Sequence, residues 1–237
     1  MEFDLTRVAR NMTRNLFGTD IVANNMANIG TTGFKRDATF IDWYTESLND
    51  VGAQRYTDFA QGELHQTDNP LDLALSTRGF FIVETPSGPA FTRNGHFAVN
   101  DQGFIQTAQG YLLMGERGPI SILSANDTAG EVQITRNGEV YLDKTLIDHL
   151  LVANIPYLYS LEKIGASLYR ISDDSLVTQL EPEQLDVRQG MLEGSNVEPV
   201  AEMVSLIELH RNFETTQRVA TAMDQILGRA TQLGDYR

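Results

Sequence analysis

The sequence predicts an α+β protein in which long N- and C-terminal helices pair as a coiled coil around a central, mostly antiparallel β domain. Three observations lead to this prediction. Apolar residues recur at alternating steps of three and four near both ends, short β-branched and aromatic runs between turns fill the middle, and most of the excess acid lies in that middle. The first pattern is typical of coiled-coil helices and the second of antiparallel strands.

The N-terminal helix is predicted from a heptad seam that ends at stop signals. The seam positions are Leu5, Val8, Met12, Asn15, Thr19, Val22, Met26 and Ile29. Asn28, Gly30 and Gly33 then favour a helix end near residue 28. Because Ala23 and Ala27 are small and four residues apart, this part of the helix permits close approach of another helix.

Residues 69–189 are predicted to form a β-rich outer domain. Residues 79–83 are a continuous apolar run, which is typical of a buried strand. The tetrapeptide Thr-Arg-Asn-Gly occurs at 92–95 and at 135–138 between strand-like runs, so both copies predict a hairpin, the first with a type I′ turn. Further turns are expected at 101–103 and 109–110.

Residues 37–68 are predicted to connect the N-terminal helix to the β domain. A free linker is polar and poor in aromatic residues, whereas this segment is rich in them. We expect these aromatic residues to dock, either on their own chain or on a neighbour. They are Phe40, Trp43, Tyr44, Tyr56 and Phe59.

The C-terminal helix repeats the heptad design and completes an inner domain formed by residues 1–36 and 190–237. Its seam positions are Leu206, Leu209, Phe213, Thr216, Ala220, Met223, Leu227 and Ala230. Ser195 or Asn196 is expected to cap the helix, and Pro199 suits its first turn.

Both predicted helices carry more apolar residues than one seam needs. In the C-terminal helix the additional residues are Val204, Ile207, Val219, Ile226 and Leu233. Exposed stripes of this kind usually mark an interface. The same residues could instead pack on the β domain or widen one stripe, and periodicity favours the two interpretations equally.

Composition excludes several classes of function. The 237 residues include no cysteine, which excludes a disulfide scaffold, a thiolate metal site and a cysteine nucleophile. The 18 basic and 32 acidic residues give a formal charge of -14, which disfavours binding to nucleic acid or anionic membranes. We find no membrane-spanning run and no secretory signal, so we expect a cytosolic protein or one exported without a cleaved signal.

No catalytic or metal-binding motif stands out. The four histidines are far apart and lack zinc-site spacing, and no nucleophile elbow, phosphate loop or dinucleotide motif is present. Asp68 and Asp72 could form a carboxylate pair, but Asp68-Asn69-Pro70 has the composition of a turn, which we favour. Asp173-Asp174 lacks the ligand spacing of a calcium loop. We therefore expect no metal, no cofactor and no enzymatic activity, and keep an enzyme built on the β domain as the contrasting hypothesis.

Two strings at opposite ends of the chain resemble signatures of the flagellar rod and hook protein family. The N-terminal signature of that family, ANNLANxxTxGFK, is similar to residues 23–35, in which Met26 replaces the usual Leu. The C-terminal signature, GxLExSNVxPV, is similar to residues 190–200. Residues 69–74, 79–81 and 92–97 agree with the family too, so the resemblance covers the whole chain.

The resemblance implies a structural subunit of the bacterial flagellar basal body. The short length and the LEGSNVEPV form resemble a proximal-rod member, with a distal-rod or hook component as the alternative. It implies that the terminal helices line the axial structure of a periplasm-spanning rod, that the β domain faces outward, and that the flagellar type III apparatus exports the chain. Implied partners are other rod subunits, including copies or near-homologues of this chain; we expect neither nucleic-acid binding nor membrane insertion.

The candidate assembly residues lie in the two signatures and along the C-terminal seam. We expect residues 28–34 and 192–197 to lie side by side, within about 15 Å, and Phe34 to be anchored in an apolar pocket. The full set is Ala23, Asn24, Asn25, Met26, Ala27, Asn28, Gly33, Phe34, Leu192, Glu193, Ser195, Asn196, Val197, Leu206, Leu209, Phe213, Met223 and Leu227.

Overall fold

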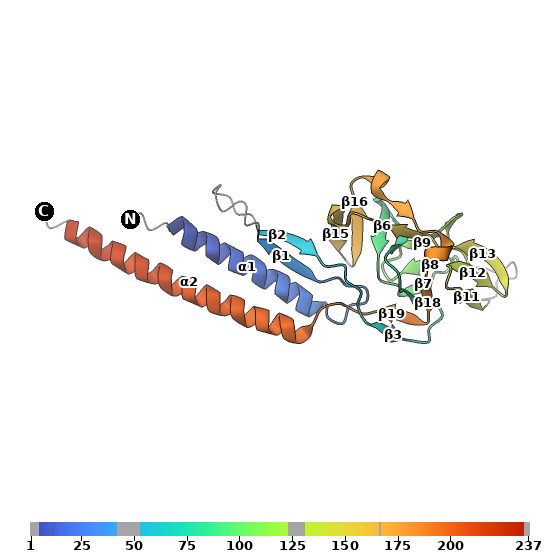
Figure 1. Cartoon of the computed structure of the whole chain (residues 1–237), viewed down its shortest axis with the longest axis horizontal. Coiled ribbons are helices and arrows are strands. Elements are labelled where there is room, and N and C mark those ends of the chain that lie inside the picture. The colour runs from blue at the N-terminus through green and yellow to red at the C-terminus, as the bar shows by residue number, and fades with distance from the viewer. Residues whose placement is uncertain (1–4, 42–52, 123–130, 166, 235–237) are drawn as a thin grey trace. The chain divides into compact units, whose positions relative to one another are not determined.

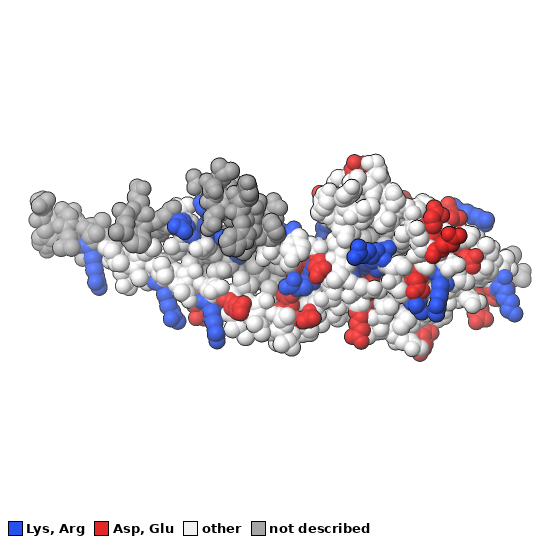
Figure 2. All heavy atoms as spheres, viewed as in Figure 1, with Lys and Arg blue, Asp and Glu red and all other residues white. Residues whose placement is uncertain are grey.

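The fold is given by a computed structural model, which describes residues 5–41, 53–122, 131–165 and 167–234. The chain forms two compact units. Unit 1 comprises Met1–Asn28, Arg36–Asp58 and Val197–Arg237, and unit 2 comprises Ile29–Lys35 and Phe59–Asn196. The acidic side chains visible in Figure 2 lie mainly on unit 2, in line with the acidic middle of the sequence.

Unit 1 is built from two antiparallel helices and a two-stranded ribbon (Figure 1). Helix α1 spans Leu5–Ala27 and helix α2 spans Pro199–Gly234, so the predicted helix end near residue 28 is confirmed. Strand β1, Asp37–Ile41, pairs antiparallel with β2, Ala53–Thr57, and β1 contacts α1. This contact matters because an isolated two-stranded ribbon is only marginally stable in water.

The prediction that the helices pair as a coiled coil is wrong. Helix α1 contacts α2, but the stripe that it buries is Gly18, Ile21, Val22 and Asn25. Among the predicted seam residues whose side chains are described, only Val22 is buried. Gly18 brings the helices together at one place, since a Cβ there would lie 3.1 Å from Leu209 Cδ2. In addition, α2 has 36 residues against 23 in α1, so the shorter helix cannot cover the longer seam.

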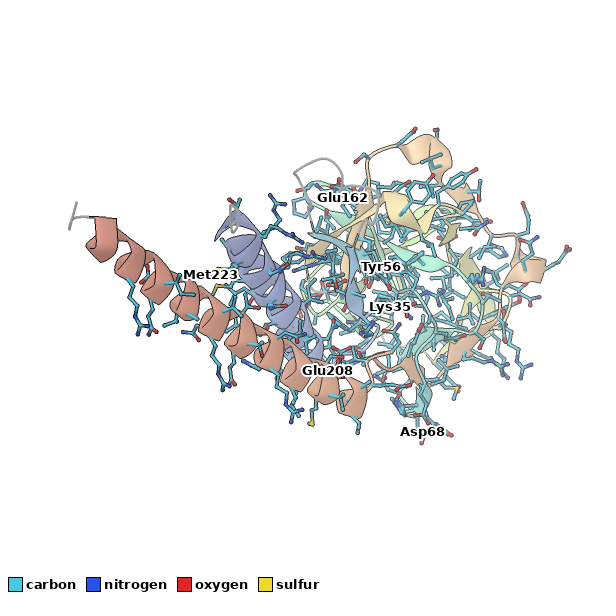
Figure 3. All side chains as sticks on the ribbon, turned by 60° about the vertical axis from the view of Figure 1, so that its left-hand side comes forward. Lys35, Tyr56, Asp68, Glu162, Glu208 and Met223 are labelled. Carbon is cyan, nitrogen blue, oxygen red and sulfur yellow. The ribbon has the colours of Figure 1, made fainter. Side chains whose placement is uncertain are left out.

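Helix α2 presents two different faces. Its half-buried positions are the predicted seam residues Leu206, Leu209, Phe213, Thr216, Ala220 and Met223. Met223 points to the side of α2 on which α1 lies (Figure 3). The opposite face is apolar at its start and exposed, whereas the side chains of Leu227 and Ala230 lie outside the described ones.

Unit 2 is a β domain whose described strands all pair antiparallel. The largest sheet has the order β15-β16-β6-β5-β9-β8-β7, with β10 beside β9, β14 beside β5 and β17 beside β14. A second sheet has the order β11-β12-β13, and two pairs, β18-β4 and β19-β3, complete the unit.

The strands and short 3-10 helices of unit 2 have the following bounds. They are β3 Leu64–Gln66, β4 Leu73–Leu75, β5 Phe80–Thr85, β6 Gly88–Thr92, β7 Phe97–Val99, β8 Ile105–Thr107, β9 Leu112–Gly115, β10 Gly118–Pro119, β11 Val132–Ile134, β12 Glu139–Leu142, β13 Thr145–His149, β14 Val152–Asn154, η2 Leu158–Ser160, β15 Leu161–Gly165, β16 Leu168–Ile171, η3 Asp174–Leu176, β17 Thr178–Gln179, η4 Pro182–Gln184, β18 Val187–Gln189 and β19 Met191–Glu193. The predicted buried strand at 79–83 is confirmed as β5, and turns follow at 101–103 and near Gly110 as expected.

The two copies of Thr-Arg-Asn-Gly adopt different structures. The copy at 135–138 is the turn between β11 and β12, as predicted, and Gly138 has a φ of 82°. The copy at 92–95 is not a hairpin, because β6 pairs with β5 and β16 while β7 pairs with β8. Gly95 instead allows a close backbone approach: a Cβ there would lie 1.6 Å from the Leu73 carbonyl oxygen. Tertiary packing therefore overrides the local turn preference.

The core of unit 2 consists of two clusters of buried apolar side chains. The larger one includes Leu73, Phe81 and Val140, and the smaller one is centred on Phe80 and Tyr169. Phe59 packs edge-on against the smaller cluster, with ring centroids 5.5 Å from Phe80 and 5.1 Å from Tyr169. Edge-to-face packing is favourable for aromatic rings.

Of the other aromatic residues in segment 37–68, only Tyr56 has a described side chain. Tyr56 in unit 1 is half-exposed. Trp43 and Tyr44 lie outside the described residues, and the side chain of Phe40 is not among the described ones.

Among the helices that the structure describes, none combines the length and the apolarity that crossing a bilayer would require.

Candidate functional site

Two buried carboxylates organise the matched signatures, Glu193 in unit 2 and Glu202 in unit 1. The side chains of both are 0% exposed. A carboxylate buried to this degree needs cations or hydrogen-bond donors around it, because desolvation of an isolated charge is costly. Each carboxylate therefore marks a network whose members can be read from its contacts.

In unit 2, Glu193 accepts hydrogen bonds from three donors. The Lys35 ammonium, whose side chain is also 0% exposed, donates to Oε1, and the Gly62 amide donates to the same oxygen over 3.0 Å. Arg93 Nη1 lies 3.3 Å from Oε2. Lys35 also donates to the Ala60 carbonyl over 2.7 Å, and Figure 3 shows it enclosed by other side chains. We call Lys35, Arg93 and Glu193 the unit 2 triad.

Backbone geometry sets the position of Glu193. It is the last residue of β19, and its Cα lies opposite that of Leu64 in β3. Its carbonyl oxygen accepts a hydrogen bond from the Gly33 amide over 2.8 Å. This bond confirms the expected closeness of residues 28–34 and 192–197 for the part of those segments that belongs to unit 2.

The first Thr-Arg-Asn-Gly copy, residues 92–95, packs against the segment that contains Thr32 and Gly33. Thr32 donates from its hydroxyl to Asn94 Oδ1 over 2.8 Å. A Cβ on Gly33, whose φ is 65°, would lie 2.3 Å from the Asn94 amide nitrogen. Three segments far apart in sequence, 31–35, 92–96 and 193–196, thus meet in unit 2.

Phe34 lies in the first of these three segments. Its side chain is buried, as predicted, but one face of its ring contacts a cation rather than an apolar group. The Lys163 ammonium lies 3.9 Å from the centre of its ring and donates to the Lys35 carbonyl over 3.2 Å. A cation over a ring face is attracted by the π electrons, so Lys163 holds Phe34 and the backbone beside it at once.

Burial and pairing act in opposite directions on Arg93. Burial lowers the pKa of the Arg93 guanidinium, while the negative charge of Glu193 and the hydrogen bond to it oppose that decrease. Buried ion pairs often contribute little net stability, because their attraction is offset by desolvation. We therefore interpret the triad as a device that fixes where segments lie rather than as a large source of stability.

In unit 1, Glu202 in the first turn of α2 gathers residues from α1 and the start of the ribbon. It accepts hydrogen bonds from Arg36 Nε and from Asn25 Nδ2, the second over 3.4 Å. Asn25 also bonds to both backbone groups of Asp37, donating to its carbonyl over 2.7 Å and accepting from its amide over 2.9 Å. The buried amide of the N-terminal signature thus links α1, β1 and α2.

Replacing Asn25 with alanine is expected to destabilise unit 1 by about 2 kcal/mol, because the buried amide and carbonyl of Asp37 would lose their partner. Urea unfolding followed by circular dichroism at 222 nm measures this change. Asn24→Ala is the matched control, since the Asn24 side chain is exposed one position away. Equal effects of the two substitutions would contradict the assigned role of Asn25.

The structure separates the predicted signature residues into different environments. Buried positions are Asn25, Gly33, Phe34, Glu193 and Val197; half-buried positions are Met26, Asn28, Leu192, Ser195 and Asn196; and exposed positions are Ala23, Asn24 and Ala27. The predicted capping by Ser195 or Asn196 is wrong, because α2 begins at Pro199 and Glu198 precedes it. Asn196 instead donates to the Ala60 carbonyl over 3.0 Å.

Charged members of both networks were absent from the predicted set. They are Lys35, Arg36, Asp37, Arg93 and Glu202. Lys35 ends the N-terminal signature, and Arg93 stands in the recurring Thr-Arg-Asn-Gly, so both positions carried a local signal. No local pattern marks Glu202.

Potential metal ligands are dispersed among the residues that the structure describes. No group of three potential metal ligands occurs there. Asp72 accepts hydrogen bonds from Thr67 and Asn69 and lies 2.8 Å from His96 Nδ1, so contacts within unit 2 satisfy its carboxylate.

Comparison with known proteins matches both units. Residues 188–233 match the family described as flagellar basal body rod FlgEFG protein C-terminal, and residues 74–142 match the flagellar hook protein FlgE/F/G D1 domain. The chain is 32% identical over 218 residues to the flagellar basal-body rod protein FlgF of Caulobacter vibrioides, covering 86% of this chain and 85% of that protein. The chain belongs to the flagellar basal-body rod protein family.

Further relatives support this assignment to the rod family. The chain is 31% identical to FlgG of Caulobacter vibrioides, covering 97% of this chain and 98% of that protein. It is 30% identical to FlgF of Salmonella typhimurium, covering 90% of each. The resemblance seen in the two signatures is thereby confirmed, and the matched C-terminal region of this rod-family chain contains Glu193, Glu202 and nearly all of α2.

Proposed function

We propose that this chain is a non-enzymatic structural subunit of the flagellar basal-body rod and that it polymerises through its terminal helices. The observation that carries the proposal is the apolar face of α2 that the chain itself leaves exposed at Val200, Met203, Val204 and Ile207. Exposed apolar stripes of this kind mark surfaces that other molecules cover. Membership of the rod family supports other axial subunits as those molecules.

Within the rod, we propose a proximal position corresponding to that of FlgF. The LEGSNVEPV form of residues 192–200 supports this placement over the distal rod. The chain would then lie in the periplasm-spanning part of the basal body, contact other proximal-rod subunits and the distal-rod protein, and reach that place through the flagellar type III export apparatus.

Deleting residues 224–237 is expected to abolish incorporation of the chain into basal bodies and to stop motility. The deletion removes the end of α2, including Leu227, Ala230 and Leu233, and leaves unit 2 untouched. The gene is replaced by the truncated one, and purified basal bodies are probed for the chain, while hydrogen exchange of the purified protein checks that the strands of unit 2 remain protected.

A matched control is Glu208→Ala, which alters an exposed charge on the same helix. Normal incorporation and motility of the truncated chain would contradict assembly through the terminal helices. Basal bodies arrested before the distal rod test the position, because a proximal subunit is present in them and a distal one is absent.

A further inference from the structure

We propose that the start of α2 binds the end of α1 in a second copy of this chain, with the two helices antiparallel. The inference rests on the proposed function and deepens it by naming the two surfaces through which neighbouring subunits meet. Both surfaces belong to unit 1, and each lies on the face of its helix that points away from the contact between α1 and α2 within one chain.

The first surface, the α2 outer face, consists of Val200, Met203, Val204, Ile207 and Arg211. The four apolar members are 75%, 50%, 50% and 53% exposed, respectively, and Arg211 is exposed one turn further on. Steps of three and four place them on one side of a helix. That side is opposite the half-buried stripe that includes Leu209.

The second surface, the α1 outer face, is lined mostly by small side chains. Its members are Ala9, Thr13, Leu16, Asp20, Ala23 and Ala27, and all are exposed. Their alternating steps of four and three form a second heptad seam, which lies opposite the buried stripe containing Gly18 and Asn25. Small side chains leave room for the large ones of another helix, as in knobs-into-holes packing.

Charge complementarity sets the register and direction of the contact. Asp20 is the acidic residue of α1, and Arg211 is the first basic residue of α2. No ion pair joins either to another described side chain. Placing Asp20 opposite Arg211 in an antiparallel pair puts Ala27 opposite Val204, because seven residues separate the members on each helix, about 10 Å along the axis.

The same register also pairs the residues in the middle of the α2 outer face with residues of α1. Ile207, four residues before Arg211, then lies opposite Ala23 and Asn24, four and three residues before Ala27. The exposed residues of the N-terminal signature, Ala23, Asn24 and Ala27, thus acquire a role that contacts within one chain do not give them. The large side chains come from α2 and the small ones from α1.

A second copy is the occupant that fits both surfaces. The two outer faces point away from each other, because each is opposite the face used within the chain, so one molecule cannot bring them together. Every copy presents one face of each kind. Such a contact is heterologous and continues from copy to copy, forming a ring or an open helical assembly rather than a closed two-fold dimer.

Disulfide trapping tests the contact directly, since the chain has no cysteine of its own. The doubly substituted A27C/V204C chain replaces the native one in cells, and purified basal bodies are oxidised and separated without reductant. We expect products at multiples of 26.4 kDa, and no such products from either single variant. The control A9C/V204C uses the same faces 18 residues out of register, about 27 Å, and is expected to give none.

Charge reversal supplies an independent test in the A27C/V204C chain. Asp20→Arg or Arg211→Asp alone is expected to lower the trapped fraction about fivefold, because an attraction becomes a repulsion. The two together are expected to restore it, since the pair is re-formed between copies. A merely structural role of either residue would not give this recovery.

Each failure points to a different conclusion. Chain that is present in basal bodies but yields no trapped multimer overturns the inference and leaves the proposed function standing. A bridge within one chain, or to a different rod protein, overturns the assignment of a second copy. Absence of the native chain from basal bodies contradicts the proposed function itself. If A27C/V204C is not incorporated, N24C/I207C tests the neighbouring contact in the same way.

Discussion

Replacing Glu193 with alanine is expected to destabilise unit 2 by about 3–5 kcal/mol, because it leaves the Lys35 ammonium and the Arg93 guanidinium buried without their carboxylate. Both cations are at least nine-tenths buried. The Gly62 amide would also lose its acceptor. The free energy of unfolding is measured by urea titration with hydrogen exchange of the strand amides, which reports on unit 2 separately from the helices.

Two further variants identify the cause of the expected loss. Glu63→Ala removes an exposed carboxylate next to Gly62, one residue before β3 begins, and is expected to change the free energy of unfolding of unit 2 by less than about 0.5 kcal/mol. The triple variant Lys35→Met, Arg93→Met and Glu193→Met removes all three charges and is expected to recover most of the loss, because no unpaired charge remains. A cost below about 1 kcal/mol for Glu193→Ala would contradict the assignment of the triad.

Two members of the triad lie close in sequence to the boundaries of unit 2. Lys35 precedes the passage of the chain from unit 2 to unit 1, and Glu193 lies just before the return at residue 197. In unit 1, Glu202 and Asn25 similarly tie the start of α2 to the end of α1. Each unit therefore fixes its own terminal segments with a buried carboxylate.

Sequence periodicity located the elements but not their packing faces. The heptad pattern identified both helices, and in α2 it also identified the half-buried stripe from Leu206 to Met223. In α1 it failed, because Gly18 and Asn25 belong to the buried stripe and neither is apolar. Gly18 packs through the absence of a side chain, and Asn25 through hydrogen bonds to Asp37. Hydrophobic periodicity cannot detect either cause.

The networks escaped prediction for a different reason. Lys35 and Glu193 are 158 residues apart, so no local spacing connects them. The recurrence of Thr-Arg-Asn-Gly was visible, but its two copies diverge because the Leu73 backbone approaches Gly95 and nothing comparable happens at Gly138. The two signatures indicated which segments contain the buried polar networks. The tertiary fold determined which residues in those segments pair with each other.

Replacing Gly33 with alanine is expected to destabilise unit 2 by about 3 kcal/mol or more, for two reasons. The left-handed backbone at Gly33 disfavours a residue with a side chain. The added Cβ would also collide with backbone atoms, which cannot move aside as a flexible side chain can. The φ of Gly33 is 65°, and the atom that a Cβ would meet at 2.3 Å belongs to the backbone of residue 94. Moving that backbone would also disturb the hydrogen bonds from the Gly33 amide to Glu193 and from Thr32 to Asn94.

Gly30→Ala is the matched control within the same signature. A Cβ at Gly30 meets nothing within 4 Å, and its φ is not in the left-handed range. Alanine there is expected to leave the free energy of unfolding unchanged or to raise it by about 0.4–1 kcal/mol, because the unfolded chain loses conformational freedom. Urea unfolding of both variants, monitored by exchange of amides in β4 and β19, separates the two glycines. If Gly33→Ala proved as harmless as Gly30→Ala, the packing of residues 31–35 against 92–96 would have to be abandoned, and with it the interpretation of the N-terminal signature as an anchor to unit 2.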